Sequence, residues 1–408
     1  MKWKRRTTIF TCLAAAVAGC SAGPRVESLT GSEAYIAQDP DDPLAKVAAA
    51  ACQQIGWHLL RQGDAMTNQV LSPASLGSAL ALVGLGASDA SATSLDELFG
   101  MKAEDRAAGI NALRAGLVNY DSLPGSIDMN EPPEHPIVHL ASRLLICDDN
   151  DPKKPFLDAI KRHFDASVER VRKSDAQASL DTWAKKHTAG LIEKSGIKVT
   201  PETLLIVQDV LLFAARWKNQ FKHSDASLIF TTGGGDKVNI KALRDTLPAK
   251  AAAGQGWEAV RLAYDDYLAM DILLPERGTH PLSWSPDVLQ ETHEALSSAP
   301  RQQVKVTMPP ADLTANFNLK TLLSALGVTL DHFDGVYGGA EIEQAVQQVR
   351  LRVNAKGTVG AALTEGTFLA SALVAQAVLT VDHPYVMRVL DVRTGWPLFL
   401  AVVSTPAQ

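Results

Sequence analysis

Two short motifs in the chain have the residue types of serine hydrolases. Ser195-Gly196-Ile197-Lys198 fits the S-x-x-K pattern, and Gly19-Cys20-Ser21-Ala22-Gly23 is the one match to G-x-S-x-G. The first motif lacks its usual S-D-N and K-T-G companions and follows a predicted helix, and the second has no strand-turn-helix setting. The sequence also contains no H-E-x-x-H and no C-x-x-C. We therefore expect neither an enzyme nor a metal site.

A segment near the C-terminus has the residue pattern of a strand that could join a sheet. The strand-like run Val349 to Val353 leads into Gly357-Thr358-Val359-Gly360-Ala361-Ala362-Leu363-Thr364, and between Gly357 and Asp382 the only charged residue is Glu365. In a strand, alternate side chains share a face, so Thr358, Gly360, Ala362 and Thr364 lie together. Because these side chains are small, this face of the strand can enter between packed strands. Each side chain too large for the space would cost roughly 1 to 3 kcal/mol. An ordinary surface loop is the alternative.

The remaining candidate groups have structural explanations. We expect His58, His163 and His187, three of ten scattered histidines, on solvated helix faces. The run Thr231 to Asp236 contains three glycines, but it lies between two strand-like runs and therefore predicts a hairpin turn instead of a phosphate loop. We expect no cofactor. The net charge of −6 argues against nucleic acid as a partner.

The elements that must position these residues change in type along the chain. Helical patterns dominate the first part and strand patterns the later part, without a β-α-β rhythm, which favours an α+β fold with antiparallel or mixed sheets. Helices are predicted over 47–60, 76–85, 155–164, 178–193 and around 317–326, and strands over 204–213, 228–232, 257–262, 268–274, 304–308, 349–353, 385–391 and 398–403.

The N-terminus has the pattern of a bacterial export signal. Four cations within residues 2–6 precede an apolar stretch, Ile9 to Ala18, that is too short to span a bilayer. Val17-Ala18-Gly19-Cys20 resembles the lipobox of bacterial lipoproteins, which implies lipidation of Cys20; a plain secretory signal is the alternative. We expect residues 1–19 to be a signal peptide, 20–43 a polar tether and 44–408 one domain. The protein would then be exported, either lipid-anchored in the cell membrane or extracellular.

Two cysteines remain after the signal peptide and the lipidation site. Cys52 and Cys147 could form a disulfide outside the cytoplasm, but two cysteines in so long a chain are also typical of buried free thiols. The sequence leaves both alternatives open.

Several blocks, in the same order along the chain, resemble the serpins, the serine protease inhibitor superfamily. The blocks are Asn68 to Thr93, Trp183 to Ile192, Phe213 to Phe221, Val260 to Pro275, Leu322 to Gly327, Lys356 to Ala362 and Pro384 to Pro406. The resemblance covers Leu44 to Pro406. It implies a serpin fold, with a large mixed main sheet, two smaller sheets, about eight or nine helices and an exposed reactive-centre loop.

The same resemblance implies a mechanism for the small-faced segment. Residues 357–364 match the hinge of the reactive loop, and in serpins a protease cuts this loop and forms an acyl-enzyme. The segment from Thr358 onward then inserts as a new central strand and distorts the protease before deacylation. Thr358 is expected near the surface before insertion. The alternative is a non-inhibitory surface lipoprotein of the same fold that acts as a binding protein.

Some positions depart from the pattern of inhibitory serpins. Ala355 and Val359 stand where these inhibitors usually have Glu, and Gln347 stands where they have a histidine of the region called the shutter. Asp209 replaces an asparagine that is common in the central strand. Leu363 replaces a small residue, but its face is the outward one. Since Gln347 can donate and accept hydrogen bonds, a shutter contact is still expected.

The family's loop spacing, counted from Thr358, predicts cleavage between Ser371 and Ala372. Because the loop is about two residues longer than usual, Leu369 and Leu373 are alternatives. No Lys or Arg occurs between Gly357 and Thr380. A trypsin-like pocket should therefore reject the loop, and elastase-like, chymotrypsin-like or subtilisin-like serine proteases are the expected partners of a monomeric protein.

Overall fold

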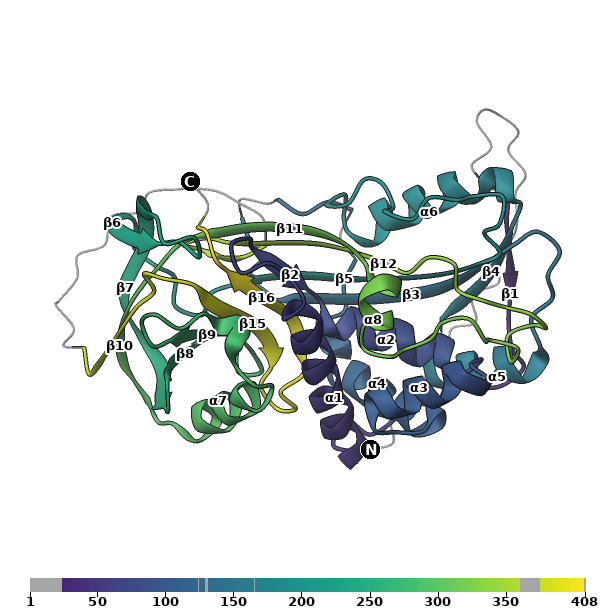
Figure 1. Ribbon diagram of the computed structural model, residues 1–408, viewed down its shortest axis with the longest axis horizontal. Coiled ribbons are helices and arrows are strands. Elements are labelled where there is room, and N and C mark those ends of the chain that lie inside the picture. The colour runs from purple at the N-terminus through teal and green to yellow at the C-terminus, as the bar shows by residue number, and fades with distance from the viewer. Residues whose placement is uncertain (1–23, 124, 129–130, 165, 360–374, 407–408) are drawn as a thin grey trace, which may run out of the picture.

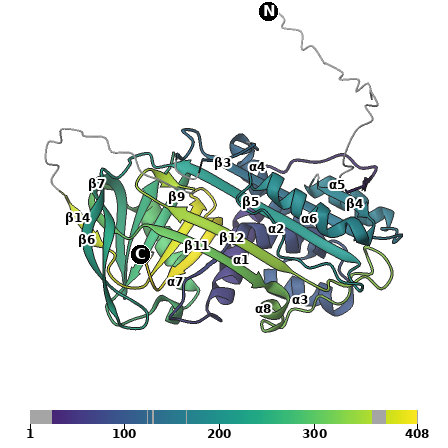
Figure 2. The same ribbon diagram turned by 90° about the horizontal axis from the view of Figure 1, so that it is seen from above.

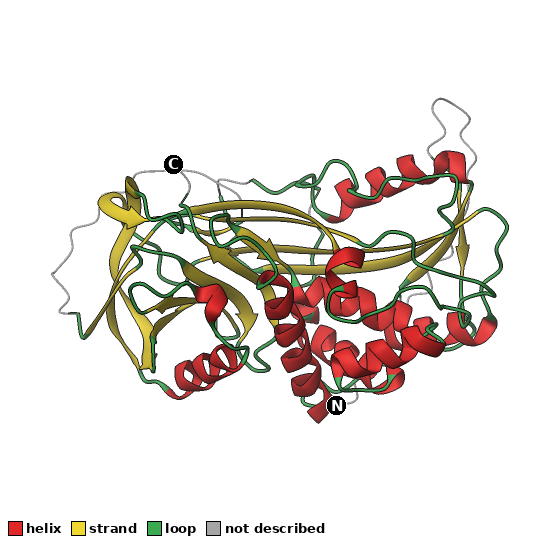
Figure 3. Cartoon of the chain, viewed as in Figure 1, coloured by secondary structure: helices red, strands yellow, loops and turns green. Residues whose placement is uncertain are grey.

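The computed structural model describes residues 24–123, 125–128, 131–164, 166–359 and 375–406 (Figure 1). Its helices and strands form an α+β fold (Figure 3), as the sequence predicts. Among the described residues, no helix has the length and apolar character needed to cross a membrane. The helices are α1 (Pro43–Leu60), α2 (Pro73–Gly84), α3 (Asp89–Phe99), α4 (Ala103–Gly116), α5 (Lys154–Phe164), α6 (Lys173–His187), α7 (Asp287–Ser298) and α8 (Leu319–Ser324).

The main sheet has seven strands in the order β1-β4-β3-β5-β13-β12-β11. It is mixed, because β3 and β4 are parallel while the other neighbours are antiparallel. The strands are β1 (Val26–Leu29), β3 (Ile137–Cys147), β4 (Ser167–Val171), β5 (Leu205–Arg216), β11 (Ala311–Asn318), β12 (Val346–Val353) and β13 (Gly357–Thr358).

The second sheet joins the two smaller sheets that the resemblance implies. Its path is β14-β10-β7-β8-β9-β15-β16-β2, with β6 paired to β7. The long strand β7 connects both halves, because it pairs with β6 and β10 along most of its length and with β8 at its end. The strands are β2 (Gln69–Leu71), β6 (His223–Thr231), β7 (Lys237–Gly254), β8 (Trp257–Ala263), β9 (Leu268–Pro275), β10 (Arg301–Met308), β14 (Ala377–Thr380), β15 (Tyr385–Asp391) and β16 (Pro397–Val403).

Helices cover the two faces of the main sheet unequally. Helices α1 to α5 and α8 lie on one face, and α6 lies on the other (Figures 1 and 2). The buried helix α2 starts where Ser72 accepts a hydrogen bond from Ser75 N and Pro73 takes the first helical position. A small separate apolar cluster, which includes Leu145, Leu180 and Ile206, packs α6 against the sheet.

The segment expected to be a polar tether, 20–43, is packed on the fold over its described part. Strand β1 pairs with β4 at the edge of the main sheet. Beyond β1, Ser32 N and Oγ donate to Asp158 Oδ1, and Asn111 on α4 binds the backbone of Ile36 and Gln38. The unpaired backbone groups of an edge strand explain why this polar segment is ordered.

Both cysteines that the sequence left undecided are free and buried, Cys52 in α1 and Cys147 at the end of β3. Burial raises the pKa of the Cys52 thiol to about 12 and that of Cys147 to about 11. Both thiols are therefore protonated at neutral pH and unreactive.

Candidate functional site: the hinge and the slot in the main sheet

The first residues of the predicted hinge already form a strand in the main sheet. In β13, Gly357 pairs with Arg216 and Thr358 with Ala215 of β5, and on the other side Thr358 pairs with Val353 of β12. Gly357 is required here because a Cβ atom would lie 2.2 Å from the Ala215 carbonyl oxygen. Thr358 is fully buried, so the expectation that it lies near the surface is wrong. The alternation of side chains along a strand predicted the face on which Thr358 lies, but it could not predict that Thr358 is already buried.

Aromatic side chains hold Thr358 in the sheet. The Thr358 hydroxyl lies 2.5 Å from Tyr264 Oη, and the ring of Trp217 stacks on Tyr264 at 4.5 Å between centroids and 6° between planes. Trp217 Nε1 also donates to the carbonyl oxygen of Asn354 at 2.8 Å. Burial raises the pKa of Tyr264, so its hydroxyl stays neutral and available for this hydrogen bond.

An ion-pair network closes the turn above the hinge. Glu131 accepts from Lys356 Nζ at 2.6 Å through one oxygen and from Arg216 Nη2 at 3.0 Å through the other. The hydrogen bond from Lys356 is the main reason why the pKa of Glu131 is lowered. Because Arg216 ends β5 and Lys356 precedes β13, Glu131 joins both sides of the point where the loop enters the sheet.

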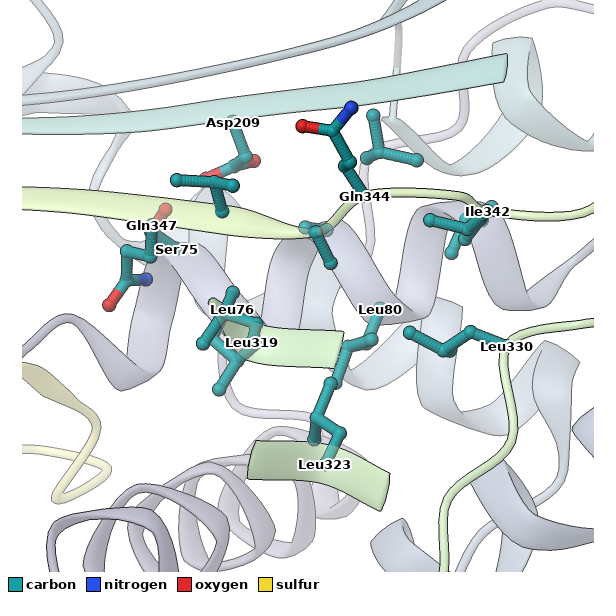
Figure 4. A pocket seen from close by; sticks show the side chains of 15 residues that line it. Ser75, Leu76, Leu80, Asp209, Leu319, Leu323, Leu330, Ile342, Gln344 and Gln347 are labelled. Atoms are coloured by element: carbon teal, nitrogen blue, oxygen red, sulfur yellow. The ribbon is translucent and has the colours of Figure 1, made fainter. Parts of the chain in front are cut away.

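Beyond the C-terminal end of β13 the main sheet contains a slot, by which we mean the space between β5 and β12. We call the end of the slot that β13 occupies its upper end. Over the described residues these two strands do not pair with each other, although each pairs with β13 at the upper end. One cavity of the slot has about 510 Å³ of space free of atoms, including open solvent (Figure 4). Its lining includes Ser75, Val207, Asp209, Val346 and Gln347. A second cavity continues the slot toward the hinge, between residues 210–213 and 347–350.

Asp209 and Gln347, two positions that depart from the family pattern, lie on opposite sides of the slot. Gln347 Oε1 accepts from Ser72 N at 2.9 Å, and its Nε2 donates to Ser72 O at 3.0 Å. This confirms that Gln347 makes a hydrogen-bonded contact at this place. Asp209 Oδ2 accepts a short hydrogen bond from Ser142 on β3. The Asp209 residue is partly exposed, but its Oδ1 atom is inaccessible and has no partner among the described residues.

Burial of the Asp209 carboxyl group raises its pKa to about 7, against the smaller opposing effects of Ser142, Ser75 and Arg114. The carboxyl group is therefore partly protonated near neutral pH. Arg114 reaches this group only indirectly, by donating to Ser142 Oγ at 3.0 Å.

The segment from Thr188 to Thr203, the covering segment, lies over the outer side of the slot. Gly196 N donates to Gln348 Oε1 at 2.6 Å, and Thr203 Oγ1 donates to Glu343 Oε2 at 2.7 Å. Ser195 and Lys198 of the S-x-x-K motif belong to this segment, and they lie in irregular backbone instead of opening a helix. Thr188, Leu191 and Ile192 of this segment line the cavity between β5 and β12.

The structure tests only part of the predicted site. Gly357, Thr358 and Val359 are described, and they lie together at the upper end of the slot. The remaining hinge residues Gly360 to Thr364, the predicted reactive bond Ser371–Ala372 with its alternatives Leu369 and Leu373, and Cys20 lie outside the described residues. Tyr264 and Glu131 were not predicted to contact the hinge, because neither has a sequence signal that links it to residues about 90 and 225 positions away.

The family model described as "Serpin (serine protease inhibitor)" matches residues 50–406. The chain belongs to the serpin family. Among similar proteins, neuroserpin of Gallus gallus is 24% identical over 399 residues, which cover 92% of this serpin and 94% of neuroserpin. An uncharacterised serpin-like protein of Thermococcus kodakarensis is 23% identical and covers 83% of this chain and 81% of its own.

Two solved structures show the same fold. The thermophilic serpin tengpin in its native state has a TM-score of 0.76 at 18% identity, and covers 92% of this serpin and 97% of its own chain. Thyroxine-binding globulin in complex with thyroxine has a TM-score of 0.74 at 18% identity, and covers 88% and 99%. Serpins are in general protease inhibitors and not enzymes.

Proposed function

We propose that this serpin traps a serine protease by inserting its cleaved reactive loop into the slot of the main sheet. The observation that carries the proposal is the position of β13: Thr358 pairs with both walls of the slot at its upper end, and Gly357 pairs with β5. The chain that follows Val359 can continue this strand downward without a change of register.

Filling the slot supplies the driving force. Each backbone hydrogen bond that the new strand makes with β5 or β12 contributes on the order of 1 kcal/mol net, and buried apolar surface adds to it. The open form is then a kinetically trapped state, whose loop is released for further insertion when a protease cuts it. The protease is inactivated only if insertion is faster than hydrolysis of the acyl-enzyme.

The direct test is incubation with elastase-like, chymotrypsin-like and subtilisin-like proteases, followed by denaturing gel electrophoresis. A band at the summed mass of serpin and protease that survives denaturation supports inhibition. Cleavage of the loop by every protease without such a band refutes it, and favours the alternative of a non-inhibitory binding protein of this fold.

A matched pair of variants tests insertion itself. In the continued register, residue 362 falls between Leu211 and Val349, which face the core, whereas residue 361 falls between the buried Leu212 and Arg350, whose exposed cation can pair with a carboxylate. Ala362→Glu therefore places an unpaired charge in the core of the filled sheet, at a cost of several kcal/mol. We expect it to lower the yield of trapped protease by at least about tenfold, and Ala361→Glu by less than about twofold. Equal yields would refute the register.

The sequence of the loop supports a preference for small or apolar residues. We propose cleavage at Ser371–Ala372, or two residues away at Leu369 or Leu373, by a protease that does not require a cation. N-terminal sequencing of the released C-terminal fragment identifies the bond. A first residue outside 369–374, or efficient trapping of trypsin through this loop, contradicts the proposal.

We also propose that the protein is exported and held at the membrane by a lipid on Cys20, with the serpin domain outside the cytoplasm. The charged and apolar residues before Cys20 support this. Intact-mass spectrometry of the protein made in a bacterial host should show Cys20 as a lipidated N-terminus. Cleavage at another residue, or release of soluble protein that retains an unmodified Cys20, contradicts the anchor.

A further inference from the structure

Three side chains connect the end of α6 to the main sheet. His139 lies on β3, with its Nδ1 2.6 Å from Asp121 Oδ1 and its Nε2 3.0 Å from Nδ1 of His187. His187 is the last residue of α6 and is half-buried. The expectation that His187 lies on a solvated helix face is therefore wrong, because the fold places His139 directly under the end of this helix.

The two imidazole rings meet edge to edge. Their planes differ by 9° and their centroids are 5.3 Å apart, while the facing nitrogens are 3.0 Å apart. This geometry fits one N–H···N hydrogen bond, in which one proton lies between the rings. A metal ion does not fit in line between them, because each bond from imidazole to a metal is about 2.0 Å long. If both rings are protonated, each facing nitrogen carries a hydrogen, and the contact becomes a repulsion between two cations.

The charged groups around this pair come from β3, from α6 and from the segment after α4. Arg143 on β3 and Lys186 on α6 are the cations near His187, and Asp121 is the carboxylate, which binds His139. Burial is the main cause that lowers the pKa of His187 to about 4, and His139, Lys186 and Arg143 lower it further. His187 is therefore neutral at neutral pH, and the hydrogen bond to His139 is intact.

The covering segment begins where α6 ends. Thr188, Leu191 and Ile192, which follow His187, line the cavity between β5 and β12. The turn between them includes Ala189 at a φ of 50°, a conformation that an alanine rarely adopts. The His139–His187 contact thus fixes the segment at the point where its side chains close the outer side of the slot.

We propose that the His139–His187 pair is a proton-sensitive latch, which holds the covering segment over the slot at neutral pH and releases it in acid. The latch itself is independent of protease inhibition. Its consequence, that acid makes the slot easier to fill, rests on the proposed function.

Hydrogen exchange followed by mass spectrometry on the whole protein, corrected for the intrinsic effect of pH, tests the latch. Peptides that span 183–195 should lose at least about tenfold in protection between pH 7 and pH 4, while peptides from β15 stay protected. His187→Gln and His139→Gln can still donate and accept a hydrogen bond but do not titrate, so each should abolish this pH dependence. His58→Gln, at an exposed site on α1, is the control and should behave like the wild type.

Two results overturn the latch: protection over 183–195 that does not change with pH in the wild type, or a loss of protection in acid that is as large in both latch variants as in the wild type. A separate measurement addresses its consequence. If a trapped protease complex forms, the fraction of loop cleavages that end in a trapped complex should be larger at pH 5 than at pH 7 for the wild type and should change less for His187→Gln; this ratio does not depend on the loss of protease activity in acid. Failure to trap any protease refutes the proposed function and leaves the exchange result as the test of the latch.

Discussion

Replacing Asp209 by asparagine should stabilise this serpin at alkaline pH. The Asp209 carboxyl group has a pKa raised from 3.8 to about 7, because burial of the carboxyl group outweighs the opposing effects of Ser142, Ser75 and Arg114. Since the pKa in the folded protein exceeds that of the unfolded chain, ionisation destabilises the fold. This penalty is absent below about pH 4, grows through the range from 4 to 7, and is complete above 7.

The size of the effect follows from the shift. A shift of about three units corresponds to about 4 kcal/mol at pH 8. An asparagine keeps one oxygen to accept from Ser142, but places an amide group where Oδ1 has no partner, which costs about 1 to 3 kcal/mol. We therefore expect Asp209→Asn to gain about 1 to 3 kcal/mol at pH 8 and to lose this advantage by pH 5.

The assay is the midpoint of the first urea unfolding transition of wild type and variant, followed by circular dichroism at pH 5, 6, 7 and 8. Asp266→Asn is the control, because an ion pair with Lys218 lowers the pKa of Asp266 and removal of that charge should give no gain at high pH. If Asp209→Asn is no more stable than the wild type at pH 8, or if the difference is the same at all four pH values, the ionised carboxyl group is not the cause.

Three further predictions concern the hinge and the core. Tyr264→Phe removes the hydrogen bond to the Thr358 hydroxyl and should cost about 1 to 2 kcal/mol and increase hydrogen exchange over 354–359. Thr358→Arg should destabilise the native state by several kcal/mol in urea unfolding, because Thr358 is already buried; an unchanged midpoint would contradict its place in the sheet. Gly77→Ala places a Cβ atom 2.3 Å from Cys52 Sγ and should lower the unfolding midpoint by about 1 to 3 kcal/mol, whereas Gly125→Ala, which meets no atom within 4 Å, is the control.

The pattern of apolar residues predicted the elements that are buried because their own side chains are apolar. The apolar helix α2 and the fully buried strand β15 agree with their predicted positions to within a few residues. The predicted helix 178–193 ends early, at His187, because Ala189 and Gly190 adopt positive φ angles and the Thr188 hydroxyl accepts from Ile192 N. Such a stop depends on backbone conformation, which a count of apolar spacings does not detect.

Strands β1 and β11, two of the elements that were missed, show what sequence patterns alone do not reveal. Strand β1 forms because the edge of β4 is free to pair with it, and its own residues, Val-Glu-Ser-Leu, carry little strand signal. Strand β11 was missed because Phe317, at its end, has helical spacing to the leucines that follow, of which only Leu319–Ser324 form α8. The resemblance to serpins and the alternation of side chains predicted where the hinge lies and which of its residues share a face. The burial of Thr358 and its contact with Tyr264 could be seen only in the structure.

Gln347 and Asp209, two residues that depart from the pattern of inhibitory serpins, do not close the slot. Gln347 uses both its oxygen and its nitrogen on the backbone of Ser72, and Asp209 binds Ser142 on its own side. Gln347 is thus held by the start of α2 and Asp209 by β3, and no hydrogen bond joins the two side chains across the slot. A strand that enters here breaks no side-chain hydrogen bond between Asp209 and Gln347. If the cleaved loop inserts as we propose, the resistance to insertion should come mainly from the covering segment, which is hydrogen-bonded to Gln348 and Glu343 and follows His187 directly.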